Sequence, residues 1–223
     1  AAVTEIPVVR NILSANERLA SENRALLARH CVCAVNIMAS PGAGKTSLIL
    51  RTAETLQGAL RVGVVEGDVA SRVDADRVAA AGIPVVQINT GGACHLDASM
   101  VGAALEQLPL EALDLVFIEN IGNLICPVDF QLGEHTRVLV SSIPEGDDKG
   151  HKYPGIFAAV DAVVLNKLDL APYVSFDREA FRRLLQGLNP QAPLFELSCA
   201  TGEGLEPWGI WLQALAERTR GPS

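Results

Sequence analysis

The sequence predicts an α/β fold in which helices cover both faces of a mostly parallel, doubly wound sheet. Short runs of β-branched and other apolar residues alternate with longer stretches of helical periodicity, as expected for parallel strands joined by crossover helices. Apolar residues make up 49% of the 223 residues, which is enough to build a core without disulfides. We therefore expect one domain over residues 31–223, with an N-terminal helix in residues 1–30 that belongs to the same unit.

The first predicted element is an amphipathic helix over residues 7–27, in which apolar residues recur on one side and charged residues lie between them. Two roles fit such a helix: packing against its own domain, which we favour, and docking on a partner subunit. A coiled coil is disfavoured because Asn16 and Asn23 fall on the same seven-residue spacing as Val9.

Seven short apolar runs are predicted as strands. In chain order they are residues 32–38, 62–66, 85–88, 115–119, 138–142, 162–166 and 194–197. Periodic stretches long enough for crossover helices lie at residues 46–56, 74–81, 96–108 and 177–188. Ligands of such sheets bind beyond the carboxyl ends of the strands, so the residues that follow each strand are the first candidates for a site.

Charge and hydropathy exclude several classes of partner. The net charge of −8 disfavours a nucleic-acid backbone or an anionic membrane surface as a ligand. No run approaches the roughly 18 consecutive apolar residues of a membrane span, and charges interrupt residues 1–30 where a signal peptide would be apolar. We therefore expect a cytoplasmic location, in which the five cysteines serve as free thiols or metal ligands.

The segment ASPGAGKT, residues 39–46, follows the first predicted strand and opens a helix, which is the position of a Walker A phosphate-binding loop. Its glycines let backbone N–H groups turn toward phosphate oxygens, and the positive end of the helix adds to that field. Lys45 would reach the terminal phosphates, and the Thr46 hydroxyl would ligate Mg²⁺. The consensus opens with glycine where this chain has Ala39. The expected nucleotide contacts are Gly42, Ala43, Gly44, Lys45, Thr46 and Ser47.

An NKxD motif after the sixth predicted strand indicates guanine as the base. It consists of Asn166, Lys167 and Asp169, and the carboxylate of Asp169 can accept hydrogen bonds from N1 and N2 of guanine, a donor pair that adenine lacks. After the seventh strand, one backbone N–H would donate to the guanine O6. The three residues that could supply it are Ser198, Cys199 and Ala200.

Acidic residues at two further strand ends complete the predicted nucleotide site. Glu119 and Gly122 occupy the place of the DxxG switch of GTPases, with glutamate instead of aspartate. Asp68 is a second carboxylate near the loop, and it could position the attacking water or merely cap the following turn. We expect Thr46, Asp68 and Glu119 to hold Mg²⁺, and Lys45, Asp68 and Glu119 to be the catalytic residues.

A metal site is predicted beside this switch. Cys94 and His95 follow a glycine pair, and Cys126 lies four residues beyond Gly122. Two thiols and an imidazole suit Ni²⁺ or Zn²⁺, and three protein ligands leave a position open for transfer of the metal. A competing site could form from His30, Cys31 and Cys33, but we favour buried thiols for these two cysteines.

Taken together, these segments resemble the HypB family of hydrogenase nickel-incorporation GTPases, which belongs to the signal-recognition-particle/MinD class of P-loop proteins. The resemblance covers nearly the whole chain, and the matching segments are residues 16–20, 40–46, 66–68, 87–91, 94–98, 117–120, 122–124, 126–127, 152–154 and 166–169. It implies that the metal ligands are Cys94, His95 and Cys126 and that Glu119 is the switch glutamate.

The resemblance also implies a set of partners. These are a second copy of the chain, in a homodimer that forms or tightens with GTP, a HypA-type nickel chaperone and the large subunit of a [NiFe] hydrogenase. Lys149 and Lys152 match basic positions that in the family approach the nucleotide near the dimer interface.

The expected function is that of a slow GTPase that binds nickel or zinc at a site coupled to its switch and assists nickel insertion. One alternative is another cofactor-delivery GTPase of the urease accessory type, but that family's metal motif is Cys-Pro-His, whereas Cys94 and His95 are adjacent. A second alternative is a metal-storage or scaffold protein with a vestigial nucleotide site. Intact Lys45, Thr46 and Asp169 disfavour it.

Overall fold

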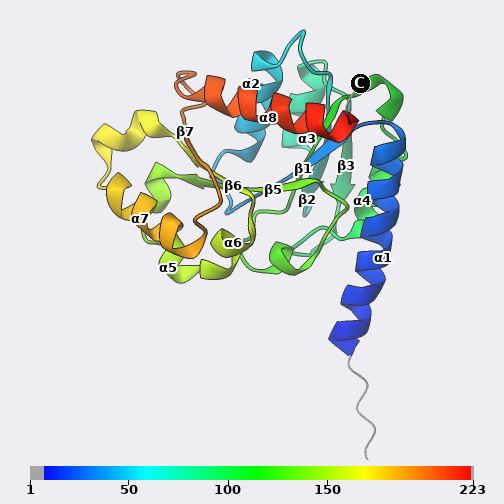
Figure 1. Ribbon diagram of the computed structural model, residues 1–223, viewed down its shortest axis with the longest axis horizontal. Coiled ribbons are helices and arrows are strands. Elements are labelled where there is room, and N and C mark those ends of the chain that lie inside the picture. The colour runs from blue at the N-terminus through cyan, green and yellow to red at the C-terminus, as the bar shows by residue number, and fades with distance from the viewer. Residues whose placement is uncertain (1–7, 222–223) are drawn as a thin grey trace, which may run out of the picture.

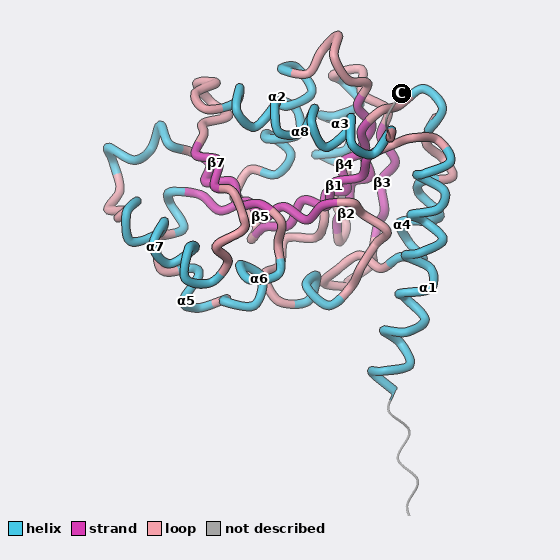
Figure 2. Tube along the Cα trace, viewed as in Figure 1, coloured by secondary structure: helices cyan, strands magenta, loops and turns pink. Residues whose placement is uncertain are grey.

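The computed structural model describes residues 8–221 and confirms the α/β fold (Figures 1 and 2). A single sheet of seven parallel strands has the order β3-β2-β4-β1-β5-β6-β7. The strands are β1 Cys33–Ala39, β2 Val62–Asp68, β3 Val85–Asn89, β4 Leu115–Glu119, β5 Thr136–Ser142, β6 Ala162–Asn166 and β7 Leu194–Glu196. All seven predicted strands are present, with ends that differ by at most two residues.

Helices cover both faces of this sheet, as Figure 1 shows. One face carries α2 (Lys45–Thr55), α3 (Val73–Ala80) and α8 (Leu205–Arg220). The other face carries α1, α4, α6 and α7, with α5 beside α7. The bounds of these five helices are α1 Val8–Arg29, α4 Ala98–Leu105, α5 Lys149–Lys152, α6 Pro154–Ala159 and α7 Arg178–Leu188. The predicted crossover helices correspond to α2, α3, α4 and α7, whereas α8 is not among the predicted elements.

The strands at the centre of the sheet are buried on both faces. Every residue of β1 and β4 is buried, which is why these strands are almost continuously apolar. On the α2 and α8 face, Trp208 of α8 is fully buried, and its indole N–H donates to the Thr52 hydroxyl at 2.8 Å. Packing of this kind fixes the strand ends, and hence the loops that follow them.

Helix α1 packs on its own domain, as favoured from the sequence. Two asparagines of α1, Asn16 and Asn23, are buried, and they satisfy backbone groups at the start of α4 and after β4. Asn23 donates to the carbonyls of Ala98 at 2.7 Å and Leu132 at 2.8 Å, and Asn16 donates to the carbonyl of Gln131 at 2.7 Å. The first turns of α1 extend beyond the sheet (Figure 1). Among the described helices, none is long and apolar enough to cross a membrane.

Candidate functional site

The loop between β1 and α2 has the backbone of a phosphate-binding loop. Gly44, at the start of α2, has φ of 101°, and a Cβ placed there would lie 2.5 Å from Nδ2 of Asn166. Glycine is therefore required both by the left-handed backbone and by the close approach of a side chain. Asn166 Nδ2 donates to the carbonyl of Ala43 at 3.1 Å, and Lys167 Nζ donates to that of Gly42 at 2.6 Å. The two predicted nucleotide motifs thus meet.

Beside these motifs lies a cavity of about 520 Å³, large enough for a nucleoside. Asp169 accepts a hydrogen bond from the Ser198 hydroxyl at 2.5 Å, so its carboxylate is held in place at the cavity wall. The N–H of Ser198 donates to the carbonyl of Glu203, and that of Cys199 to Asn166 Oδ1. No described residue accepts from the N–H of Ala200, which makes this amide the expected donor to O6 of guanine.

Two arginines on the rim of this cavity were not predicted from the sequence. Arg51 lies on α2 and Arg77 on α3, and each also pairs with a carboxylate near the rim. Surface arginines have no motif of their own, so only the fold brings them to this cavity. Burial raises the pKa of the Cys199 thiol, at the same wall, to about 11, so it stays protonated and uncharged at neutral pH.

A second pocket of about 290 Å³ lies on the other side of the phosphate loop. Thr46, buried at the start of α2, donates from its hydroxyl to Glu119 Oε1 at 2.8 Å. Glu66 is the register partner of Glu119 across β2 and β4, and both carboxyl groups are buried. Burial is the main cause that raises the pKa of Glu66 to about 8 and that of Glu119 to about 7.

The donors in this pocket fit Mg²⁺. Oε2 of Glu66 and Oε2 of Glu119 are both buried without a hydrogen-bond partner among the described residues, which is costly unless a cation or water meets them. With the Thr46 hydroxyl they form an all-oxygen set, the type that Mg²⁺ prefers. Glu66 was not predicted as a site residue. Residues i and i+2 of a strand lie on the same face, so its spacing from Asp68 on β2 is the sequence signal that could have placed Glu66 in the site.

Asp68 serves the turn that follows β2. Its Oδ1 accepts from the backbone N–H groups of Ala70 at 2.8 Å and Ser71 at 2.6 Å, and the residue also lines the phosphate pocket. It therefore caps the turn, as the second interpretation expected, while staying within the pocket. Gly122 lines the same pocket, and a Cβ there would lie 2.9 Å from Cγ of Pro41. The switch segment thus touches the phosphate loop.

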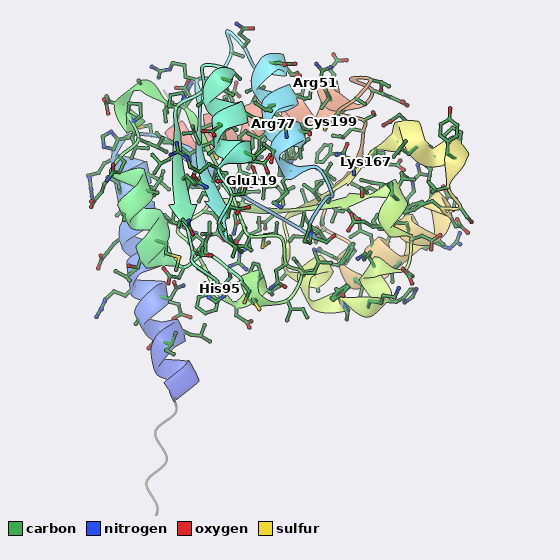
Figure 3. All side chains as sticks on the ribbon, turned by 180° about the vertical axis from the view of Figure 1, so that it is seen from behind. Arg51, Arg77, His95, Glu119, Lys167 and Cys199 are labelled. Atoms are coloured by element: carbon green, nitrogen blue, oxygen red, sulfur yellow. The ribbon has the colours of Figure 1, made fainter. Side chains whose placement is uncertain are left out.

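Cys94, His95 and Cys126 come together, as predicted. One donor atom from each lies within 4.8 Å of the others, and Cys94 Sγ is 3.6 Å from His95 Nδ1. Cys94 and His95 belong to the loop between β3 and α4, and Cys126 begins a short 3₁₀ turn, Cys126–Asp129, beyond β4. The His95 ring stacks on Phe130 with ring centroids 3.9 Å apart. In Figure 3, Glu119 lies between Arg77, on the rim of the nucleoside cavity, and His95.

The protonation of the thiol pair depends on whether a cation is bound beside it. The pKa of Cys94 is raised, mainly by its hydrogen bond with Cys126, which favours the protonated thiol, and to a smaller extent by burial and by repulsion between the two thiolates. A bound cation reverses this effect and favours both thiolates. Cys94 is exposed, so this site opens to solvent rather than being enclosed like a structural zinc site.

Other predicted residues lie elsewhere. Lys149 pairs with Glu145 and Lys152 with Asp148, and neither lines the nucleoside cavity or the phosphate pocket of its own chain. The interpretation of Cys31 and Cys33 as two buried thiols is right for Cys33 and wrong for Cys31, which is exposed with φ of 55°. The strand begins at Cys33, so strand alternation does not extend back to Cys31.

Comparison with known proteins agrees with this arrangement. The family model of the CobW/HypB/UreG nucleotide-binding domain matches residues 33–196. The hydrogenase maturation factor HypB of Rhizobium leguminosarum bv. viciae is 46% identical over 213 residues, which cover 96% of this chain and 71% of that protein. The probable HypB of Methanocaldococcus jannaschii is 45% identical over 201 residues, which cover 90% of this chain and 91% of the relative. This chain belongs to the HypB family of hydrogenase maturation factors.

Solved HypB structures share the fold. The crystal structure of HypB from Archaeoglobus fulgidus superposes with a TM-score of 0.85 at 43% identity and covers 91% of this chain and 99% of that one. HypB from Helicobacter pylori in complex with nickel gives a TM-score of 0.88 at 35% identity, with 94% and 98% covered. The signal recognition particle receptor FtsY of Elizabethkingia anophelis, at 19% identity and a TM-score of 0.57, shares the fold alone.

Proposed function

We propose that this HypB-family chain is a GTP-hydrolysing metallochaperone that binds nickel at Cys94, His95 and Cys126 and assists nickel insertion into a [NiFe] hydrogenase. The observation that carries the proposal is the convergence of three soft donor atoms within 4.8 Å, on loops that leave the same sheet edge as the nucleotide pocket. Thiolate and imidazole donors with an open position suit a metal that is captured and then released.

In this proposal GTP binds across both pockets. Asp169 and the N–H of Ala200 recognise guanine, and Lys45 neutralises the terminal phosphates. Thr46, Glu119 and Glu66 would hold Mg²⁺, with Asp68 in the same pocket, and the ion would supply charge neutralisation at the phosphates. Hydrolysis is expected to be slow, because Lys45 is the only cation among the described residues that line the phosphate pocket.

The switch would couple the two ligands. Glu119 ends β4 in the phosphate pocket, and Cys126 follows seven residues later in the same connection. When Glu119 and Gly122 close on the γ-phosphate, the chain between them and Cys126 changes its path, so the three metal donors separate or approach. Nickel must then alter the affinity for GTP by the same factor by which GTP alters the affinity for nickel, typically about 1–3 kcal/mol.

Nickel is proposed as the working metal because a related HypB is solved in complex with nickel, although Zn²⁺ would compete at any site of this composition. The partners we propose are a second copy of the chain, a HypA-type nickel chaperone and the hydrogenase large subunit. In the GTP-bound homodimer, Lys149 and Lys152 would approach a nucleotide near the interface. Free thiols as ligands suit the reducing cytoplasm as the place of action.

The test measures Ni²⁺ affinity by competition with a chromophoric chelator in the presence of GDP or of a non-hydrolysable GTP analogue. The parent should bind Ni²⁺ with different affinities in the two states, and Cys94→Ala should lose most of the binding. Cys31→Ala is the matched control, since Cys31 is also an exposed thiol but lies outside the cluster. Equal affinities in the two states would contradict the coupling, and a chain that binds no GTP would favour the storage or scaffold alternative.

A further inference from the structure

Beneath the metal site, a chain of buried polar side chains crosses the middle of the sheet. It begins at Asn36, which is fully buried at the centre of the otherwise apolar strand β1. A buried amide costs free energy unless its donor and acceptor are both satisfied. Asn36 meets this requirement through side chains alone, since it accepts from Asn120 Nδ2 at 3.3 Å and donates to Glu134 Oε1 at 3.2 Å.

Asn120 attaches one end of this chain to the histidine segment of the metal site. It directly follows Glu119 and is fully buried. Its Oδ1 accepts from the backbone N–H of Leu96 at 3.2 Å and from that of Ile121 at 2.9 Å. Leu96 is the neighbour of His95, so a single side-chain oxygen joins the backbone next to a metal ligand to the backbone next to the switch glutamate.

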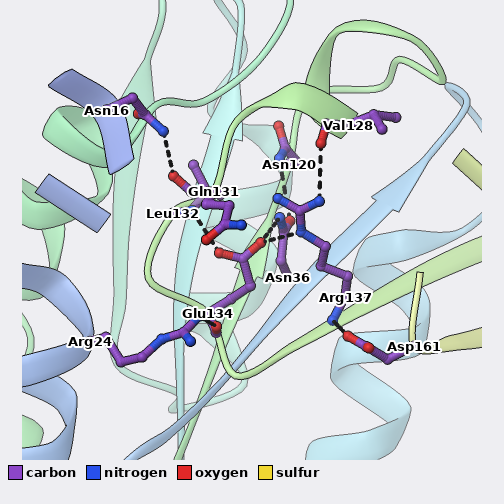
Figure 4. Close-up of polar contacts among 10 residues, drawn as sticks. All are labelled: Asn16, Arg24, Asn36, Asn120, Val128, Gln131, Leu132, Glu134, Arg137 and Asp161. Carbon is purple, nitrogen blue, oxygen red and sulfur yellow. Dashed lines mark hydrogen bonds and ion pairs between the residues drawn. The ribbon is translucent and has the colours of Figure 1, made fainter. Parts of the chain in front are cut away.

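Glu134 and Arg137 attach the other end to the Cys126 segment (Figure 4). Both oxygens of Glu134 are used: Oε1 accepts from Arg137 Nε at 2.7 Å, and Oε2 accepts from the N–H of Leu132 at 2.6 Å. Arg137 Nη1 donates at 3.0 Å to the carbonyl of Val128, which lies in the short turn that begins at Cys126. Glu134 is 3% exposed, so this ion pair is shielded from solvent.

We propose that Asn36, Asn120, Glu134 and Arg137 are positioning residues that set the separation between the Cys94-His95 segment and the Cys126 segment. They also link this separation to the strand end that bears Glu119. The inference rests on the proposed metal site, and it adds the physical connection through which the nucleotide state reaches that site. Asn120 is its centre, because a shift of the Glu119–Asn120 peptide moves a side chain that is bonded to both segments, directly to one and through Asn36 to the other.

Hydrogen bonds that are shielded from solvent make such a connection stiff, and the bond of Arg137 to Glu134 at 2.7 Å is charge-assisted as well. An exposed polar contact would exchange with water and absorb a small displacement of Glu119. Here a displacement of Glu119 reaches Leu96 directly through the side chain of Asn120. Asn36 and Glu134, in contrast, hold the Cys126 segment in a fixed position relative to β1. The positions of the two segments that carry the metal ligands thus depend on one connected set of buried side chains.

The test uses Asn120→Ala and Asn36→Ala in the full chain, with Ni²⁺ as the probe and two readouts. These are the Ni²⁺ dissociation constant with GDP and with a GTP analogue, and the thiolate-to-nickel charge-transfer absorption. Asn120→Ala should weaken Ni²⁺ binding tenfold or more and bring the ratio of the two constants close to one. Asn36→Ala keeps the bonds of Asn120 to Leu96 and Ile121, so it should retain more affinity but still lose the nucleotide dependence. GDP affinity should stay within about twofold of the parent in both variants.

The matched control is Asn189→Ala. Asn189 also donates to backbone carbonyls, those of Phe157 at 3.0 Å and Val160 at 2.7 Å, but it is remote from both sites. Asn189→Ala should lower stability without removing a hydrogen bond of Asn36, Asn120, Glu134 or Arg137. Parental Ni²⁺ affinity and nucleotide dependence in both test variants would overturn the inference, as would an equal effect of Asn189→Ala. A parent that takes up no Ni²⁺ would instead remove the proposed function, and this inference with it.

Discussion

The Thr46 hydroxyl donates a 2.8 Å hydrogen bond to Oε1 of Glu119. This contact joins the first turn of α2, where phosphate is held, to the end of β4, from which the metal-site segment departs. Oε2 of Glu119 has no hydrogen-bond partner among the described residues. The same holds for Oε2 of Glu66, which lies opposite Glu119 on the adjacent strand β2. Burial thus disfavours the ionised form of both carboxyl groups, and a cation placed between them would favour it.

Glu119→Gln should separate two effects of this carboxylate: the stability that is lost by burying it, and its contribution to the binding of GTP with Mg²⁺. The pKa of Glu119 is raised to about 7 from an ordinary value of 4.5, mainly by burial, so ionisation destabilises the nucleotide-free fold progressively as pH rises above 4.5. The variant should have a higher Tm than the parent at pH 8 without nucleotide, and the difference in Tm should almost vanish at pH 4. It should also lose most of the stabilisation that GTP with Mg²⁺ gives the parent.

Thermal unfolding at the two pH values, with and without the nucleotide, measures both effects. Mg²⁺ and a GTP analogue that stabilise the variant as much as the parent would show that Glu119 takes no part in metal binding.

Asp169→Asn should abolish guanine preference. The variant keeps an oxygen that can accept from the Ser198 hydroxyl, but it loses the charged acceptor for N1 and N2 of guanine. Charge-assisted hydrogen bonds contribute about 1.5–3 kcal/mol each, so GTP affinity should fall by about 100-fold or more. Titration with a fluorescent GDP measures this loss, and Glu203→Gln, an exposed carboxylate near the same loop, is the control. Retention of GTP binding by the Asn variant would contradict the assignment of the base site.

Local sequence and the positions of the strand ends determine much of the candidate site. The phosphate loop and the NKxD motif are contiguous, and both follow buried strands whose carboxyl ends meet at one edge. Cys94 and Cys126, separated by 31 residues, meet at this edge for the same reason, since each follows a strand of the sheet. The chain of side chains through Asn36 could not be predicted, because a lone asparagine in an apolar run does not specify its partner. Glu134 lies 98 residues away, and only the register of β1 and β5 places it.

Helix α8 illustrates the same limit. Pro207 and Gly209 give its first turns low helix propensity, so the sequence pattern there is weak. The helix forms because Trp208 and Leu212 are fully buried against the sheet and α2, and this gain is visible only in the folded chain. Tertiary packing of one face thus overrides local preference.

Phe130→Leu should weaken metal binding without removing a ligand. The His95 ring stacks on Phe130 at a centroid separation of 3.9 Å, and this contact restricts the rotation of a half-exposed imidazole. Leucine fills part of the volume but offers no flat face, so His95 must be ordered when the metal binds. Aromatic pairs contribute about 0.5–1.5 kcal/mol, which predicts a loss of Ni²⁺ affinity of roughly two- to tenfold. Chelator competition measures it, and unchanged affinity would show that His95 is ordered by other contacts.

The most acid-sensitive contact outside the sites is predicted to be that of Asp114 with Arg61 and Arg220. Oδ2 of Asp114 accepts from the backbone N–H and Nε of Arg61, at 2.8 and 3.0 Å, and Oδ1 pairs with both guanidinium groups. These hydrogen bonds lower the pKa of Asp114 from 3.8 to about 2. A depressed carboxyl pKa adds stability above the ordinary value and loses it as pH falls toward the folded value. The parent should therefore lose about 2 kcal/mol between pH 5 and pH 2 through this group alone.

Asp114→Asn should accordingly lower the free energy of unfolding by about 2 kcal/mol at pH 7, and the difference from the parent should shrink as pH falls below 4. Urea unfolding at pH 7 and pH 3 measures both values. Asp76→Asn provides the control, because Asp76 forms an exposed pair with Arg72 at 3.6 Å, and exposed pairs contribute about 0–1 kcal/mol. A pH-independent difference between Asp114→Asn and the parent would mean that Asp114 acts through packing and not through its charge. In that case the loss would persist unchanged at pH 3.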